Sequence, residues 1–215
     1  QDVAAEKKSF TANKGLFTYN INLEVEREAE FIVIVDPVTR DELKVKGTGN
    51  INMSVNPNGS ISMAGIYKLN SGSYELNYGI VNRKFILLDG STVMLSGDPN
   101  NASLDITAAY EISTPPIDLI SNEIGGSTSP ASVPYKRKIP FEVLLKITGT
   151  ALKPLLAFDI RIKDKAEGVS YALETTIENK LEQLRTDESQ MNKQVFALLA
   201  LNRFIGDESS NFFGG

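Results

Sequence analysis

The sequence predicts a mainly β, antiparallel fold that ends in two helices. In five segments apolar and polar residues alternate with a period of two, which is typical of strands with one dry and one wet face. Turn-forming residues separate these segments at short intervals, which favours an antiparallel sheet. After residue 163 the apolar period becomes that of a helix.

The alternating segments identify the side chains that we expect on the dry face of the sheet. Between the second and third segments, Asn-Pro-Asn-Gly at 56–59 predicts a hairpin turn. Further strands are expected at 30–35, 42–46, 72–81, 84–88, 92–96 and 141–148. The dry-face residues are Ile21, Leu23, Val25, Ile51, Met53, Val55, Ile61, Met63, Leu104, Ile106, Ala108, Phe158, Ile160 and Ile162.

Two helices are expected after the strands. Residues 170–185 carry Leu173, Ile177 and Leu181 on one face, beside acidic residues on another. A second helix at 190–205 follows a cap at Asp187 or Ser189 and ends with Gly206 as its C′ residue. Because this helix is apolar nearly all round, it is either buried or available to a partner.

The pattern divides the chain into a β region at 1–163 and a helical segment at 164–215. Ser, Gly and Pro dominate residues 121–134, and a basic run follows, so a mobile loop is expected at about 121–138. No stretch is apolar enough to span a membrane. The chain begins without Met and without a signal peptide, and we expect it to be a fragment of a longer protein.

Composition excludes most enzymatic chemistry. The chain has no His and no Cys, so it cannot form a Ser-His-Asp triad, a Cys-His pair or a zinc site with imidazole or thiolate ligands. Gly-Thr-Gly at 47–49 precedes no predicted helix and is interpreted as a turn rather than a phosphate cradle. The net charge of −5 argues against nucleic acid as a partner. We expect no catalytic residues, no metal and no cofactor.

The repeated apolar face has two interpretations that composition leaves open. It is either the core of an ordinary β-sandwich or a surface for an apolar ligand. An acyl chain of 16 carbons that leaves a bilayer loses about 12 kcal/mol, at about 0.8 kcal/mol per CH₂, and an apolar groove restores that loss. Strands with aliphatic inner faces and polar outer faces provide such a surface.

An ordered set of short motifs between residues 59 and 110 resembles the C-terminal domain of the TamB family, within the AsmA-like superfamily. The motifs are Gly-Ser-Ile at 59–61, Gly-Ile-Tyr at 65–67, Gly-Ser-Tyr at 72–74, Phe-Ile-Leu at 85–87, Gly-Ser-Thr-Val at 90–93, Gly-Asp-Pro at 97–99 and Leu-Asp-Ile-Thr-Ala-Ala-Tyr at 104–110. Residues 192–204 resemble the helix that follows in Bacteroidota-type members. The chain departs from the family in lacking the Trp often found near Leu95.

The resemblance implies a long curved sheet folded into an open apolar groove, called a β-taco. It implies a periplasmic module that carries phospholipid between the inner and outer membranes and supports outer-membrane protein assembly. The parent protein would be anchored in the inner membrane and reach the outer one. The fourteen dry-face residues would then line the groove, and phospholipid acyl chains would be the ligand.

The resemblance also implies a protein partner, an Omp85-type outer-membrane protein that is TamA-like or BamA-like. The segment expected to engage this partner falls beyond Gly215. One alternative is therefore a β scaffold that docks the partner through a free sheet edge without carrying lipid. The second helix, with Val195, Phe196, Leu199 and Phe204, either docks a partner or closes the end of the groove. A β-sandwich adhesion domain is the third interpretation.

Overall fold

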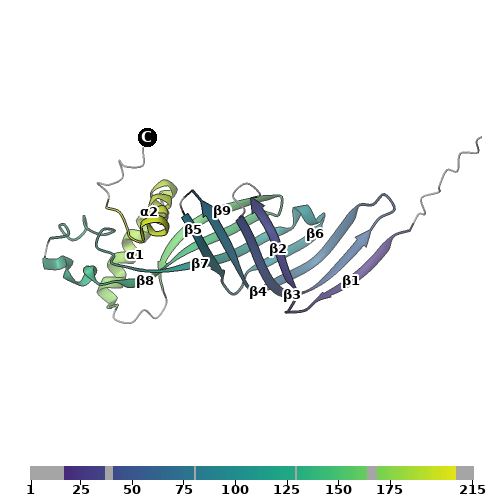
Figure 1. The fold of residues 1–215 in the computed structure, drawn as a ribbon, viewed down its shortest axis with the longest axis horizontal. Helices are drawn as coiled ribbons and strands as arrows, with labels where there is room; N and C mark the ends of the chain where they lie inside the picture. Colours follow the sequence, from purple (N-terminus) through teal and green to yellow (C-terminus); the bar gives the residue numbers. More distant parts are fainter. Residues whose placement is uncertain (1–16, 37–40, 80, 129, 164–168, 207–215) are drawn as a thin grey trace, which may run out of the picture.

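The fold is a single antiparallel sheet followed by two helices (Figure 1). The computed structural model describes residues 17–36, 41–79, 81–128, 130–163 and 169–206. Its mainly β architecture with C-terminal helices confirms the predicted fold class. The strands are β1 Tyr19–Val25, β2 Glu30–Asp36, β3 Asp41–Val55, β4 Ile61–Tyr78, β5 Val81–Leu87, β6 Thr92–Gly97, β7 Ser103–Thr114, β8 Ile139–Thr150 and β9 Lys153–Ile162.

Two long strands, β3 and β4, organise the sheet. Its main path runs β1-β3-β4-β5-β7-β8-β9; β2 pairs beside β1 on β3, and β6 bridges β4 and β7. The predicted hairpin joins β3 to β4, where the amide of Gly59 donates to the carbonyl of Asn56. Sequence patterns divided each long strand into two short ones, because glycines interrupt the apolar alternation in both. The Gly-Thr-Gly segment at 47–49 is therefore not a turn, since it lies inside β3.

A β-bulge explains the interrupted pattern. The pairing of β3 with β4 shifts between Lys46 and Gly47, which leaves an extra residue on β4. Such a bulge bends a strand and increases its twist. The expected strand at 72–81 was also wrong at its end, because Gly79 has a φ of 57° and turns the chain from β4 into β5.

The strand register places one continuous apolar face on the sheet. Directly opposed residues of antiparallel strands point to the same side. Leu23 opposes Ile51, Met53 opposes Met63, and Ile106 opposes Ile147. Following these pairs across the sheet puts all fourteen predicted dry-face residues on one side. This side is called the concave face below, because its strands turn toward one another around a cavity.

Both predicted helices form, and their caps follow from the sequence. Helix α1, Tyr171–Arg185, has Ser170 as N-cap, and its side chain accepts from the amide of Leu173. Helix α2, Glu188–Leu201, has Asp187 as N-cap. It ends earlier than expected, because Asn202 rather than Gly206 adopts the left-handed conformation, with a φ of 57°. Asparagine tolerates this conformation better than most residues.

The helices cover one end of the concave face, opposite β1 (Figure 1). Phe204, which follows α2, packs edge-on against Phe141 of β8, with ring centroids 4.9 Å apart. Both rings are fully buried. In α2 the buried side chains include Met191, Val195 and Leu198. The helices therefore close the concave face over β8 and β9 and leave it uncovered toward β1.

The segment between β7 and β8 includes residues 121–138, which the sequence predicts as a mobile loop. It holds turns and a short 3₁₀ helix, η2, Pro130–Lys136. Ser132 is fully buried there and donates a hydrogen bond to the carbonyl of Ser127. Lys180 of α1 forms an ion pair with Glu123 at 2.9 Å. These contacts anchor the loop to the helical end of the domain.

Arg185 joins α1 to the outer edge of β9. Its Nη2 donates to the carbonyl of Ile160 and its Nε to Asp159, both at 3.0 Å. We expect Arg185→Met to lower the free energy of unfolding by about 1–3 kcal/mol, because a partly buried carbonyl and a carboxylate lose their donor. Urea unfolding followed by far-UV circular dichroism measures the change. The exposed Arg203→Met is the control and should stay within about 0.5 kcal/mol of the parent.

Candidate functional site

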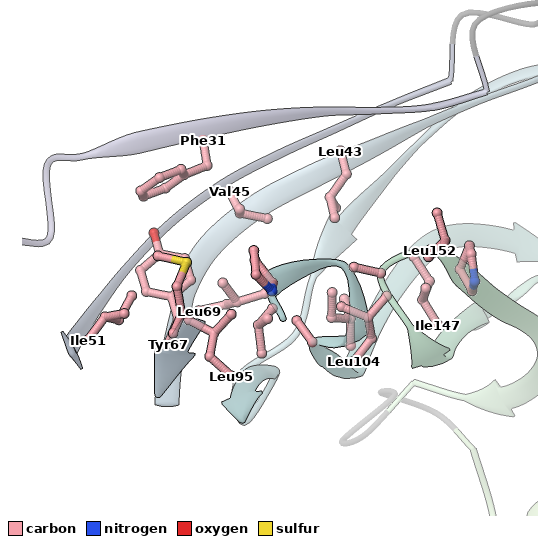
Figure 2. A pocket seen from close by; sticks show the side chains of 17 residues that line it. Phe31, Leu43, Val45, Ile51, Tyr67, Leu69, Leu95, Leu104, Ile147 and Leu152 are labelled. Carbon is pink, nitrogen blue, oxygen red and sulfur yellow. The ribbon is translucent and has the colours of Figure 1, made fainter. Parts of the chain in front are cut away.

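A cavity of about 500 Å³ lies on the concave face (Figure 2). Phe31, Leu43 and Val45 form one wall, and Leu95 and Leu104 face them from the other in Figure 2. The two walls come from β2 and β3 on one side and from β6 and β7 on the other. Phe31 is 46% exposed, and Leu152, between β8 and β9, is 66% exposed. The cavity is therefore open to solvent and large enough for a small apolar ligand.

Four of the residues predicted to line a groove do line this cavity. They are Ile51 of β3, Met63 of β4, and Leu104 and Ile106 of β7. Ile106 is nearly inaccessible at 1% exposure, whereas Met63 and Leu104 are half-buried. Strands β3, β4 and β7 thus contribute to one apolar surface, because the concave face folds toward itself.

Six other predicted residues continue the concave face beyond the cavity, toward the edge of the sheet. Ile21 and Leu23 on β1 are 39% and 37% exposed, and Ile61 on β4 is 47% exposed. Aliphatic side chains rarely gather on one exposed surface without a functional reason. This surface, called the apolar platform below, consists of Ile21, Leu23, Val25, Met53, Val55 and Ile61.

The remaining four predicted residues lie toward the helical end, within the packed core. Ala108 and Ile160 are fully buried, and Ile162 is nearly so. Phe158 packs beside Phe85, with ring centroids 6.5 Å apart. Helices α1 and α2 contact β9 at this end. These side chains share the concave face with the cavity, but other side chains already cover them.

Sequence reasoning did not assign most of the cavity wall. Leu43 and Val45 alternate with charged residues, so their period carried a signal, whereas Val93 and Leu95 flank the apolar Met94 and show no such alternation. Their strands were expected, but the face of each strand was not assigned. The residues missed are Phe31, Leu43, Val45, Tyr67, Leu69, Val93, Leu95, Pro99, Ala102, Ile147, Ala151, Leu152 and Pro154.

Among the side chains that line the cavity, the hydroxyl of Tyr67 is the one polar group. Tyr67 of β4 is 7% exposed, and its hydroxyl oxygen is buried without a hydrogen-bond partner. Burial raises the pKa of this phenol, so the group stays protonated at neutral pH. The lining carries no charged side chain. The cavity can therefore bind an apolar ligand, and the Tyr67 hydroxyl can donate one hydrogen bond to it.

Charged groups are scarce on the whole concave face. Among strand residues whose side chains the structure describes, Asp41 and Arg83 are the charged ones on this face. Asp41 is buried and accepts from the Tyr74 hydroxyl at 3.0 Å and from the amide of Asn77 at 2.8 Å. Arg83 lies over the ring of Tyr110, 5.6 Å from its centroid. Both lie outside the cavity lining.

The residues expected to form a partner-binding helix surface lie mostly inside the domain. Val195 and Leu199 are each 3% exposed, and Phe204 is fully buried. Phe196 is half-buried and packs against the same core. In this chain α2 therefore covers the end of the concave face, as one of the two interpretations of the helix expects.

Comparison with known families agrees with this architecture. The family model described as the TamB C-terminal domain matches residues 1–214. The chain belongs to the TamB C-terminal domain family. TamB proteins are components of the cell envelope and act as non-enzymatic transport and assembly modules. No curated protein and no solved structure matches the chain.

The described residues of the TamB domain contain no group of three side chains that could hold a metal ion. None of the helices in the described part of the chain is long and apolar enough to cross a membrane. The cavity and the apolar platform together are the candidate functional surface of this TamB domain.

Proposed function

We propose that this TamB domain is a periplasmic module whose concave face binds phospholipid acyl chains and passes them between the inner and outer membranes. The observation that carries the proposal is the open, apolar cavity that continues onto the apolar platform. A closed sandwich core would leave neither an open cavity nor exposed aliphatic side chains along the same face. Burial of an acyl chain there restores the roughly 0.8 kcal/mol per CH₂ that it loses on leaving the bilayer.

The concave face is covered at one end and open at the other, which supports passage of an acyl chain rather than binding in a single enclosed site. The helices cover this face over β8 and β9, while toward β1 it stays open and apolar. A chain seated against Leu104 can therefore extend past Met63 toward Ile21 without meeting a charged side chain among the described residues. A β-taco in the parent protein would continue the same surface.

Neighbouring residues on opposite faces of β6 provide the test. Leu95 lines the cavity and is half-buried, whereas Met94 points to the convex face and is 49% exposed. We expect Leu95→Arg to abolish copurifying phospholipid, because a charge in the cavity opposes the entry of acyl chains. Met94→Arg adds the same charge one residue away and should leave bound lipid unchanged. Ile106 is less suitable, because a charge at this fully buried position would unfold the domain.

Native mass spectrometry of the purified domain, with lipid extraction as a check, measures bound phospholipid. Circular dichroism confirms that each variant is folded. Phospholipid on the parent and on Met94→Arg, but not on Leu95→Arg, supports the groove. A folded parent domain that carries no phospholipid, even after incubation with it, contradicts the proposal and favours a protein scaffold.

Docking of a TamA-like or BamA-like Omp85-type protein is a second candidate function, and the edge of β1 favours it. Within the described residues β1 pairs with β3 alone, so its other edge is available for strand addition. Because the chain has no cysteine, Asn22→Cys introduces a unique thiol at this edge. Disulfide cross-linking to a single-cysteine series on the edge strand of the partner should then give one register. Equal yields at all positions would argue against strand pairing.

A further inference from the structure

The cavity contains an unused hydrogen-bond donor. The hydroxyl group of Tyr67 is buried and has no partner. Seven residues along the same strand, on the same face, Tyr74 is also buried, but its hydroxyl group donates to Asp41 at 3.0 Å. A buried donor without an acceptor costs stability, because it has lost its hydrogen bonds to water. Such a group calls for an acceptor that the chain itself does not supply.

The backbone of β3 allows the Tyr67 ring to lie across it. A Cβ atom at Gly47 would stand 2.9 Å from Cζ of Tyr67, so only glycine leaves room for the ring. On its other side the ring meets Phe31 edge-on, with centroids 5.2 Å apart. In Figure 2 the hydroxyl oxygen points from the ring toward the wall that carries Phe31. The donor is therefore held in a fixed place at the Phe31 end of the cavity.

The side chains around the Tyr67 hydroxyl determine which kind of hydrogen-bond acceptor can reach it. The lining offers no cation to compensate a phosphate group, and burial keeps the phenol protonated, as its raised pKa indicates. A charged headgroup therefore stays outside the apolar cavity. The first acceptor on a lipid that enters with its chain is the carbonyl of the ester that joins the chain to the glycerol.

We propose that the Tyr67 hydroxyl donates a hydrogen bond to the ester carbonyl of an acyl chain bound in the cavity, and so makes this site selective for ester-linked lipids. The inference rests on the proposed function and names its ligand class. Phe31 packs edge-on against the ring of Tyr67. Its ring, 46% exposed on β2, moves aside at little cost in packing when a carbonyl arrives.

The test compares two phosphatidylglycerols with identical saturated chains, one a diester and the other a diether. An ether oxygen is a weaker acceptor than a carbonyl, and a diether lacks the carbonyl oxygen that projects from the first carbon of each acyl chain. The domain is stripped of lipid and incubated with an equal mixture, and native mass spectrometry gives the ratio of the two complexes. We expect the parent to favour the diester roughly fivefold to tenfold. In Tyr67→Phe the ratio should fall to about one.

Tyr74→Phe is the matched control, because it removes a hydroxyl from the same strand and face that already has a partner. It should keep the preference for the diester. A second readout separates binding from folding: the unfolding midpoint of lipid-free Tyr67→Phe should equal or exceed that of the parent, since the lost hydroxyl had no partner. A lower midpoint would overturn the inference by showing that the hydroxyl serves the fold.

The outcomes distinguish this inference from the proposed function. Equal binding of diester and diether by the parent overturns the role of Tyr67 and leaves the groove intact. A preference that survives in Tyr67→Phe does the same. Binding of neither lipid contradicts the groove itself.

Discussion

Replacing Gly47 with valine is expected to lower the free energy of unfolding by about 3 kcal/mol or more, at the upper end of the cost of overpacking. A Cβ atom at this position would stand 2.3 Å from the carbonyl oxygen of Lys68, which belongs to the backbone of the neighbouring strand. The backbones of β3 and β4 must then separate at the bulge. The ring of Tyr67 must also leave its position, because the same Cβ atom meets its Cζ at 2.9 Å.

Thr48→Val is the matched control for this substitution. It places the same β-branched side chain one residue along β3, where the residue points to the other face. The hydroxyl group of Thr48, which this variant removes, makes one long hydrogen bond, at 3.4 Å to Oδ1 of Asn70. We expect the free energy of unfolding of Thr48→Val to stay within about 1 kcal/mol of the parent value. Because the chain has no tryptophan, urea unfolding is best followed by far-UV circular dichroism. Equal losses for both variants would show that β3 has more space at Gly47 than the geometry indicates.

Phe141→Ala is expected to lower the free energy of unfolding by about 3–5 kcal/mol, which is the usual range for removing a buried aromatic ring. Phe141 is fully buried on β8 and forms the edge-on contact with Phe204 that fastens the end of α2 to the sheet. Its loss leaves a cavity beneath the helices. Unfolding is expected to begin with the release of α2, because the ring contact of Phe141 with Phe204 holds the end of α2 against β8.

Hydrogen exchange of the α2 amides together with urea unfolding measures both effects. The control is Leu201→Ala, at a position on α2 that is 47% exposed, and its change should stay below about 1 kcal/mol. Faster exchange in α2 than in β3 after Phe141→Ala supports the role of this contact in closing the groove. Uniform acceleration over the whole sheet would instead indicate that the helices and the sheet unfold as one unit.

The helical end also decides how the concave face is divided. Ile160 and Met63 lie on the same face, yet one is covered and the other lines an open cavity. The difference lies in what packs over them, because strand pairing places both side chains on the concave face. The proposed lipid-binding surface is therefore the part of the face that the chain's own helices leave uncovered.

The sequence by itself determined the elements and the face of each predicted residue. A strand has a period of two, so local alternation is enough to separate Ile21 or Leu104 from its polar neighbours. Pairing then brought all fourteen such residues to one side of the sheet. The helix starts at Ser170 and Asp187 were equally local, because a cap depends on residues within one turn.

Only the tertiary structure decided which of these residues meet a cavity. The bulge in the pairing of β3 with β4 beside Gly47, the cover that Phe204 provides, and the approach of Phe31 to Tyr67 each join residues far apart in the chain. Alternation records the face of a residue but carries no information about what lies opposite that face. For the same reason the unpartnered hydroxyl of Tyr67 was invisible in the sequence, since a missing acceptor is a property of the folded surroundings.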